Sequence, residues 1–293
     1  VVYTQWLNDW GGIEADLTIT RTSQTNFTII TGAGVTRRDL TRLRRIASGF
    51  ADVLITDVSL DRAVIGLMGP MARDILQPLA ETDLAHAAFR FARAKETSVA
   101  GVPARLTRIT YMGELGWEIS CAAKDAVTIW RALASAGAKP AGMHAMDSLR
   151  IEKGYRHWGH DISPEDNPFE AGLDFVVKLD KPAEFIGQAA LAAKKDSPLT
   201  RRLVAFKLQR PEPILVGHEP IYRNGNVTGF ITSAAYGHTV GGAVGLGYVT
   251  CEDATDAEKL FSAKFEIVVA GKSIPADAAL NALHDPANSH MRA

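Results

Sequence analysis

The sequence has few cysteines and no long hydrophobic run. Its 293 residues include two cysteines, Cys121 and Cys251. This number is too small for a disulfide scaffold and fits a reducing compartment. No apolar stretch approaches the roughly 20 residues that cross a bilayer, and the N-terminus lacks a signal-peptide pattern. We therefore expect no membrane partner and a cytoplasmic location, or the mitochondrial matrix if the source is eukaryotic.

An excess of positive charge is also missing. Lys and Arg number 32 against 33 Asp and Glu, and the formal net charge is -1. Neutralising phosphates requires clustered cations, so we expect no nucleic-acid partner. The densest basic run, from Arg37 to Arg45, is typical of a solvated helix face, although such a face could attract a polyanion. The hydrophobic content of 46% is ordinary for a globular chain that can form two or three packed units.

The first 140 residues alternate short strand patterns with helix patterns. The expected strands span 1–7, 13–20, 27–31, 53–58, 63–68 and 102–110, and the expected helices span 38–50, 71–79 and 125–136. Between the first two strands, Asn8 to Gly12 predicts a tight hairpin turn. The chain begins with Val1 in the middle of a strand, and we expect it to be a piece of a longer polypeptide.

Asp16 is an acidic residue inside the second expected strand, among Ile13, Leu17 and Ile19. Two interpretations stay open for an acid at such a position. It lies either on the solvent face of the strand or in a cleft, where its pKa is altered for a chemical task.

A second hairpin is predicted in the segment YMGELGWEIS, residues 111–120. Gly113 and Gly116 permit a turn that brings Tyr111 and Glu118 onto facing strands. The two side chains could point into one pocket, where the ring stacks on a planar heterocycle and the carboxylate accepts from its NH groups. They could equally form an ordinary cross-strand pair.

The segment from Gly142 to Gly187 carries the densest set of chemically distinctive residues. Apolar spacing predicts an amphipathic helix over 143–152, with Met143, Met146, Leu149 and Ile151 on one stripe and the charged residues elsewhere. Gly154 is placed to end this helix. Beyond the helix, a strand is expected over 175–179 and a further helix up to Lys195.

The loop over 155–161 has neither helical nor strand periodicity. It is either a surface connection whose aromatics cover a core edge or a loop held by its own side chains. Its two histidines, His157 and His160, are three apart and lack a third ligand at a known spacing, so no metal site is predicted.

The last third of the chain predicts a small all-β unit. After a linker at 195–198, six short strands are expected at 202–208, 219–223, 227–233, 243–249, 264–269 and 272–275. Their regular spacing is typical of a barrel or a sandwich. The glycines of 237–247 lack the strand-to-helix context of a dinucleotide loop. We expect two domains, at 1–195 and 199–293.

Six motifs, in this order, carry a resemblance to a known family. They are YTQWLNDWGGIEADLTITR, YMGELGWEIS, DSLRIEKGYRHWGHDI, NPFEAGLDFVVKLDK, FIGQAAL and AYGHTVGGAVGLGYV. Together they resemble the aminomethyltransferase family, which includes the glycine cleavage system T protein. The sequence is most similar to the folate-binding C-terminal region of dimethylglycine and sarcosine dehydrogenases. The resemblance implies an α+β fold of three subdomains arranged as a cloverleaf, with a C-terminal small β-barrel and part of the first subdomain missing.

The resemblance also implies roles for individual residues. The family's acid after the GGI turn, which assists one-carbon transfer to the folate nitrogens, corresponds to Asp16. Tyr3 stands thirteen places before this acid at the position of a family tyrosine, and Thr18 is at the position of a folate contact in the dehydrogenase branch. Tyr111 and Glu118 correspond to the residues that contact the pterin.

One position departs from the T-protein pattern. The arginine that precedes the Asp-Ser-Leu-Arg segment in T proteins is Met146 here. Its loss removes a fixed cationic donor for folate. Three basic side chains could replace it: Arg150, Arg156 and His157. Alternatively, Arg150 is a structural partner of Asp147 or Glu152. The dehydrogenase branch characteristically has an apolar residue at this place.

The implied cofactor is tetrahydrofolate, with FAD only in a separate domain absent from this chain. The implied partners are folate and a flavin-dependent amine-oxidising domain or subunit. We hypothesise that the chain joins a one-carbon unit at the formaldehyde oxidation level, as an iminium or free formaldehyde, to tetrahydrofolate. Three alternatives stay open: a lipoyl-protein-dependent aminomethyltransferase, a folate-dependent demethylase of sulfonium or methoxy compounds, and a folate-binding protein without catalysis.

Overall fold

The chain divides into two compact units, each of which is described by itself. The structure is a computed structural model that describes residues 1–252 and 254–293. The first unit comprises Val1–Tyr3, Leu17–Ala141 and Asn288–Ala293, and the second comprises Thr4–Asp16 and Gly142–Ala287. This division by contacts differs from the expected division near residues 195–199, which follows the change in sequence pattern and stays a prediction.

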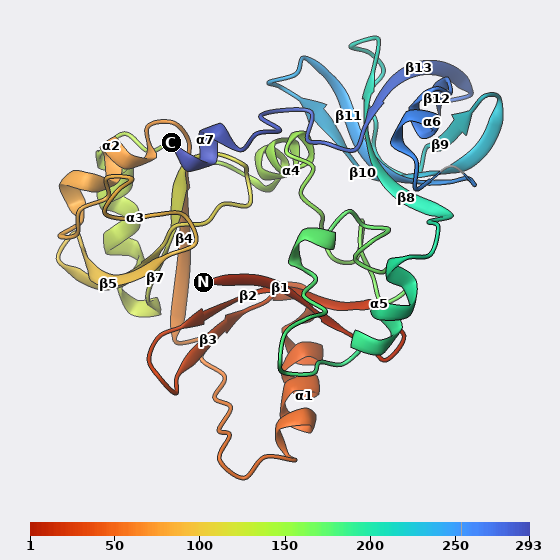
Figure 1. The fold of residues 1–293 in the computed structure, drawn as a ribbon. Coiled ribbons are helices and arrows are strands. Elements are labelled where there is room, and N and C mark those ends of the chain that lie inside the picture. Colours follow the sequence, from red (N-terminus) through yellow and green to blue (C-terminus); the bar gives the residue numbers. More distant parts are fainter. Residues whose placement is uncertain (253) are drawn as a thin grey trace. The chain divides into compact units, whose positions relative to one another are not determined.

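The first unit is built on antiparallel sheets. Its elements are β3 (Phe27–Ile30), α1 (Thr36–Ala47), β4 (Arg62–Met68), α2 (Ala72–Leu76), β5 (Ala94–Val99), β6 (Val102–Thr107), β7 (Gly116–Ala122), α3 (Ala126–Ser135) and α7 (Ser289–Arg292). Four strands form one sheet in the order β4-β7-β6-β5. A smaller sheet has the order β1-β2-β3, and its strands β1 (Val2–Leu7) and β2 (Ile13–Arg21) belong in part to the second unit. Figure 1 shows both sheets and their helices.

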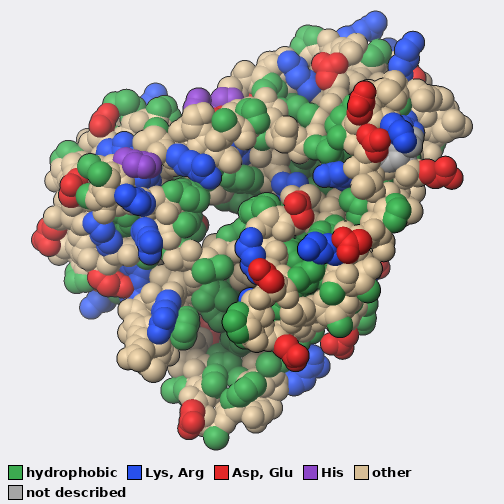
Figure 2. Space-filling model, viewed as in Figure 1, with side chains coloured by type: hydrophobic (Ala, Val, Ile, Leu, Met, Phe, Trp, Pro, Cys, Tyr) green, Lys and Arg blue, Asp and Glu red, His purple; other side chains and the backbone are tan. Residues whose placement is uncertain are grey.

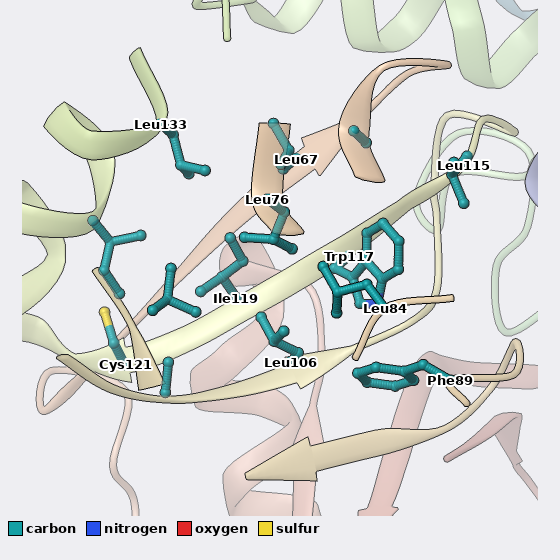
Figure 3. Packing of buried hydrophobic residues seen from close by; sticks show 14 residues of the cluster. Leu67, Leu76, Leu84, Phe89, Leu106, Leu115, Trp117, Ile119, Cys121 and Leu133 are labelled. Atoms are coloured by element: carbon teal, nitrogen blue, oxygen red, sulfur yellow. The ribbon is translucent and has the colours of Figure 1, made fainter. Parts of the chain in front are cut away.

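The core of the first unit lies on one face of the four-stranded sheet (Figure 3). Along β7, Trp117, Ile119 and Cys121 are fully buried, while Glu118 and Ser120 between them are only partly buried. This alternation follows from the period of two in a strand, so Glu118 points to the opposite face from the core. Helix α3 covers the core face with Ile129 and Leu133, which belong to the same hydrophobic cluster. Burying these side chains fixes the strand that carries Glu118.

The second unit contains a closed six-stranded barrel. Its elements are α4 (Met143–Glu152), α5 (Gln188–Lys195), β8 (Arg201–Leu208), β9 (Pro220–Arg223), β10 (Asn226–Gly237), β11 (Gly242–Thr250), α6 (Ala257–Phe261), β12 (Phe265–Val269) and β13 (Lys272–Ala279). The strands close in the order β10-β11-β8-β13-β12-β9 (Figure 1). Val204, Phe206 and Leu208 point inward from β8, and Leu260 of α6 joins the same core. The six predicted strands are confirmed, and the barrel alternative is the correct one.

Helix α4 packs against the outside of the barrel. Ile151 contacts the outward-facing side chains of β8 and β11, among them Leu203 and Leu246. The predicted bounds of α4 and its end at Gly154 are confirmed. The predicted apolar stripe is wrong, because Met143 is 65% exposed while Ser148, Arg150 and Glu152 are buried. These polar side chains are accepted in the interface because they find partners there, as described below.

Two predicted strands are absent from the described residues. Residues 53–58 have no regular structure, and Val53 and Leu54 are exposed. Residues 175–179 begin in a single 3-10 turn, Asp174–Val176, with Phe175 62% exposed. Short apolar runs do not distinguish a strand from an irregular segment. Conversely, β5 was not predicted, because its sequence AKETSV is largely polar and it lies at the edge of its sheet.

The charged side chains on the visible face are mixed in sign. Figure 2 shows Lys and Arg side chains lying among Asp, Glu and apolar side chains. Among the described residues, no helix has the length and apolar character that a membrane crossing requires.

The turn between β1 and β2 is closed by close backbone packing. Gly11 has a positive φ of 85°, which favours glycine. The N–H of Gly12 donates to Asn8 Oδ1 at 2.7 Å, and a Cβ added to Gly12 would lie 1.8 Å from the carbonyl oxygen of Pro164. The side chain of Asn8 donates to that same oxygen at 3.0 Å. Gly11 therefore permits the turn, and Gly12 lets the hairpin lie directly against the segment that contains Pro164.

We predict that Gly12→Ala destabilises the protein. The methyl group collides with a backbone carbonyl, so the turn or the 164 segment must shift, which costs about 1–3 kcal/mol or more of the free energy of unfolding. The matched control is Gly34→Ala, because an added Cβ at Gly34 has no atom within 4 Å. Chemical unfolding of both variants tests this, and equal midpoints for Gly12→Ala and Gly34→Ala contradict the packing argument.

Candidate functional site

Asp16 lies on the partly buried face of strand β2. Burial alternates along β2: Ile13, Ala15 and Leu17 are buried, while Glu14 and Asp16 are intermediate. Asp16 is thus neither on a fully exposed face nor in the core. Its Oδ1 accepts a hydrogen bond of 2.7 Å from Nε2 of Gln5 on the neighbouring strand β1. This contact could not be predicted from the sequence, since a glutamine in a strand is ordinary.

The backbone next to Asp16 is held by the loop that follows α4. Trp158 donates its indole N–H to the carbonyl of Ile13 at 2.9 Å. The N–H of Ile13 donates to the carbonyl of Asp166, also at 2.9 Å. Both groups of Ile13 are therefore satisfied by residues more than 140 positions away, which fixes the strand three residues before Asp16. Trp158 also packs against the hydrophobic cluster that contains Ile13 and Ile162, so both interpretations of this loop hold: its aromatic ring covers a core edge, and its own side chains fix it.

That loop is in turn fixed by a buried ion pair. Nη1 of Arg150 donates to Oδ2 of Asp161 at 2.7 Å, and both side chains are nearly inaccessible. Nε of Arg150 donates to Asp147 at 3.1 Å. The predicted pairing of Arg150 with Asp147 is confirmed, whereas Glu152 instead accepts from the backbone N–H groups of residues 239 and 240. Asp161, the main partner, was not predicted.

The guanidinium of Arg156 is held by three backbone carbonyls, one just before the 155–161 loop and two about 15 residues further along the chain. Its Nε donates to Ala171, Nη1 to Gly154 and Nη2 to Gly172, at 2.9, 2.7 and 3.3 Å. Arg156 also lines a cavity of about 470 Å³ together with Arg202. These contacts describe a structural role, and the binding of folate by Arg156 stays a prediction.

His157 is the remaining candidate for replacing the family arginine. Its backbone N–H donates to Asp161, and its ring lies 4.6 Å from the ring of His160. Burial lowers the pKa of His157, and the charges of Arg150 and His160 lower it further, against smaller opposing effects of two aspartates. The imidazole is therefore neutral near pH 7.

Glu118 on β7 is a partly buried acid whose Oε2 atom is buried. Its neighbours across the sheet are Gly66 on β4 and Thr107 on β6. Among the described residues, its Oε2 has no hydrogen-bond partner. Burial raises the pKa of Glu118 above its ordinary value of 4.5. An unpaired buried carboxylate oxygen costs free energy, and such a group is expected where a ligand supplies the donor.

Tyr111 lies in the loop between β6 and β7 rather than on a strand. The prediction that Tyr111 and Glu118 lie on facing strands is therefore wrong, because β6 ends at Thr107 and Glu118 is paired with that residue. Tyr111 is partly buried. The turn is longer than the two glycines suggested, which places the phenol in the loop and the carboxylate in the sheet.

The other predicted contacts lie on the small sheet. Thr18 on β2 pairs with Ile30 on β3, and Tyr3 on β1 is 37% exposed. Tyr3, Thr18, Tyr111 and Glu118 belong to the first unit, and Asp16 and Arg156 belong to the second. The common site for Asp16, Tyr111 and Glu118 stays a prediction.

Family comparisons agree with both parts of the sequence. Residues 1–181 match the family model described as the GCVT N-terminal domain. Residues 201–285 match the model described as the glycine cleavage T-protein C-terminal barrel domain. The chain belongs to this aminomethyltransferase family. The predicted resemblance and the α+β class with a C-terminal barrel are thereby confirmed.

Individual relatives cover nearly the whole chain. It is 38% identical over 295 residues to a 4-methylaminobutanoate oxidase (formaldehyde-forming) of Paenarthrobacter nicotinovorans, covering 99% of this chain and 35% of the relative. It is 36% identical over 271 residues to the mitochondrial dimethylglycine dehydrogenase of Homo sapiens, covering 91% and 31%. The chain thus spans about a third of the length of these relatives. The glycine cleavage system aminomethyltransferase T from Bartonella henselae has the same fold, with a TM-score of 0.80 at 30% identity over 94% of this chain and 73% of that chain.

We predict that Glu118→Gln stabilises the protein at neutral pH. The folded state raises the pKa of Glu118, so wild-type stability falls as the pH rises from about 4.5 through the folded pKa and then levels off. A neutral amide at this position removes the fall in stability with rising pH. The variant therefore has a higher free energy of unfolding than wild type at pH 8, and this free energy changes less between pH 5 and pH 8.

Urea unfolding at pH 5 and pH 8 measures this difference. Glu96→Gln is the control, because the Glu96 side chain is 67% exposed and its ion pair with Arg105 contributes about 1 kcal/mol at most. If the free energy of unfolding changes equally between pH 5 and pH 8 in wild type and in Glu118→Gln, the pKa of Glu118 is not raised in the folded state.

Proposed function

We propose that the chain is a tetrahydrofolate-dependent one-carbon transfer domain that forms methylene-tetrahydrofolate from the carbon of a demethylated amine. Membership of the aminomethyltransferase family supports folate as the acceptor. Relatives named as an oxidase that forms formaldehyde and as a dimethylglycine dehydrogenase support a methylated amine as the source. Met146, in place of the T-protein arginine, also favours this branch over glycine cleavage.

The observation that carries the proposal is the buried Oε2 of Glu118, which has no hydrogen-bond partner within residues 1–252 and 254–293. A pterin ring presents amino and ring N–H donors along one edge, and a buried carboxylate is suited to accept two of them. Glu118 stands at the position that the family uses for this contact. Tetrahydrofolate supplies the nucleophilic nitrogens that receive the one-carbon unit, and the residues of this chain fit such a ligand.

The protein's part is to orient the ligand and to move protons. Glu118 holds the pterin edge, and Tyr111 offers a ring for stacking beside it. Orientation of this kind supplies rate by positioning. Asp16 is the candidate that accepts a proton from a folate nitrogen as that nitrogen bonds to carbon. A carboxylate suits this role because it can take up a proton and return it to the departing hydroxide or amine.

The source of the one-carbon unit is a separate flavin-dependent amine-oxidising domain or subunit, which holds FAD. This part of the proposal is supported by the length of the relatives, since the chain spans about a third of them. A cytoplasmic location, or the mitochondrial matrix if the source is eukaryotic, is part of the same proposal.

Titration with tetrahydrofolate followed by addition of formaldehyde tests the proposal. We expect saturable binding and accelerated formation of methylene-tetrahydrofolate over the uncatalysed reaction. Binding without acceleration favours a non-catalytic folate-binding protein, and methyl-tetrahydrofolate as product favours a demethylase. Release of ammonia from an aminomethyl-lipoyl protein favours the glycine cleavage reaction. Absence of folate binding overturns the proposal.

We predict that Asp16→Asn lowers turnover and leaves the Kd for tetrahydrofolate nearly unchanged. The amide keeps the shape of the side chain but cannot accept the proton, and loss of general acid-base assistance costs about 10²–10⁴-fold in rate. Asp9→Asn in the exposed turn of the same hairpin is the control. Equal turnover of wild type and Asp16→Asn removes Asp16 from the mechanism.

A further inference from the structure

Gln5 and Asp16 form a short hydrogen bond between two neighbouring strands. The distance from Gln5 Nε2 to Asp16 Oδ1 is 2.7 Å, at the short end of the range for an N–H donor on a charged acceptor. An ionised carboxylate can only accept, so the amide nitrogen rather than the amide oxygen of Gln5 must face it. Both residues are partly buried, which shields the bond from competing water.

The backbone on both sides of this bond is fixed. The turn between β1 and β2 is closed by Asn8 on Gly12, and Ile13 is bonded through both backbone groups. These backbone contacts leave the orientation of the two side chains to side-chain interactions, of which the bond between Gln5 and Asp16 is one. A hydrogen bond from Gln5 removes rotational freedom of the Asp16 carboxylate, which is what a proton-accepting group needs.

The donor on β1 is the side-chain amide of Gln5, which carries no charge. A lysine or arginine here would pair the charge of Asp16 and lower its basicity more strongly than an amide does. The next acid on the same face, Glu14, also has a carboxamide neighbour, with Asn8 Nδ2 at 3.5 Å from its Oε1. Amides from the turn and from β1 thus contact both carboxylates without adding positive charge.

We propose that Gln5 is a positioning residue for proton transfer by Asp16, acting through its hydrogen bond to Oδ1. This inference rests on the proposed function. It assigns to Gln5 no contact with the ligand: the effect of Gln5 on the reaction passes through the carboxylate of Asp16.

The test is a double-mutant cycle in the full chain. Gln5→Met keeps the length and approximate shape of the side chain and removes the donor. We expect kcat for methylene-tetrahydrofolate formation to fall by about 10–100-fold, as for a small misplacement of a catalytic group, while the Kd for tetrahydrofolate changes by about twofold or less. In the Asp16→Asn background, Gln5→Met should cause no further loss, because there is no carboxylate to orient.

A matched glutamine elsewhere controls for general effects. Gln209 makes the same kind of bond, Nε2 to Asp277 Oδ1 at 2.8 Å, on the exposed outside of the barrel. Gln209→Met should leave kcat unchanged in both backgrounds. A purely structural role of Gln5 would give the same fractional loss in wild type and in Asp16→Asn, and this result overturns the proposal.

A structural measurement separates this inference from the proposed function. Crystal structures of wild type and of Gln5→Met should show the Asp16 carboxylate turned away from its wild-type position in the variant. If the carboxylate keeps its position without the donor, the positioning role is wrong even when folate chemistry is found. If the wild type binds no tetrahydrofolate, the proposed function fails while the structures still decide whether Gln5 holds Asp16.

Discussion

The buried ion pair between Arg150 and Asp161 is the contact on which the second unit depends. Asp161 is fully buried, and its Oδ2 accepts from Arg150, from the N–H of His157 and from Ser233. Its Oδ1 accepts from the hydroxyl of Thr232, on β10. Burying two charges costs several kcal/mol each unless every lone pair and proton is used. Here one carboxylate joins helix α4, the loop after it and the barrel wall, so its desolvation is offset by bonds to all three.

The position of Asp16 follows from this contact through a short series of hydrogen bonds. The Arg150–Asp161 pair fixes the loop that contains Trp158, and the indole of Trp158 holds the carbonyl of Ile13. Asn8 and Gly12 fit against the carbonyl of Pro164 in the same stretch of chain. The geometry of the β1–β2 hairpin is therefore set by residues about 150 positions further along the sequence. A change in the Arg150–Asp161 pair would therefore alter the position of Asp16, although the pair does not contact Asp16.

The elements that the sequence predicts well are those whose signal is local. The six barrel strands follow from alternating patterns and turn residues, and helix α4 has the predicted bounds because Gly154 ends it. The buried face of α4 could not be predicted, since Arg150 is buried only because Asp161 and Ser233 are there, 11 and 83 residues away. Apolar periodicity assumes that charge faces solvent, and this assumption fails where a charge has a distant partner.

The candidate site, too, depends on contacts that the local sequence does not reveal. Asp16 stood out as an acid in a strand, but its candidate role came from the resemblance, as did the pterin contacts of Tyr111 and Glu118. The raised pKa of Glu118 depends on burial that only the folded sheet reveals. Gln5 carried no signal in the sequence, because the short distance to Asp16 arises from the pairing of β1 and β2. Residue type thus suggests the reacting groups, whereas the residues that orient them emerge from tertiary structure.

Met146 stands where T proteins have an arginine, and the contacts of the nearby basic residues decide which of them could take its place. Arg150 is engaged by Asp147, Asp161 and Ser233, and the three nitrogens of Arg156 donate to backbone carbonyls. Turning either guanidinium toward a ligand would break these hydrogen bonds, which are buried or partly buried, and a buried group left without a partner costs about 1–3 kcal/mol. His157 is neutral near pH 7, because its pKa is lowered, and it would donate one N–H without a charge.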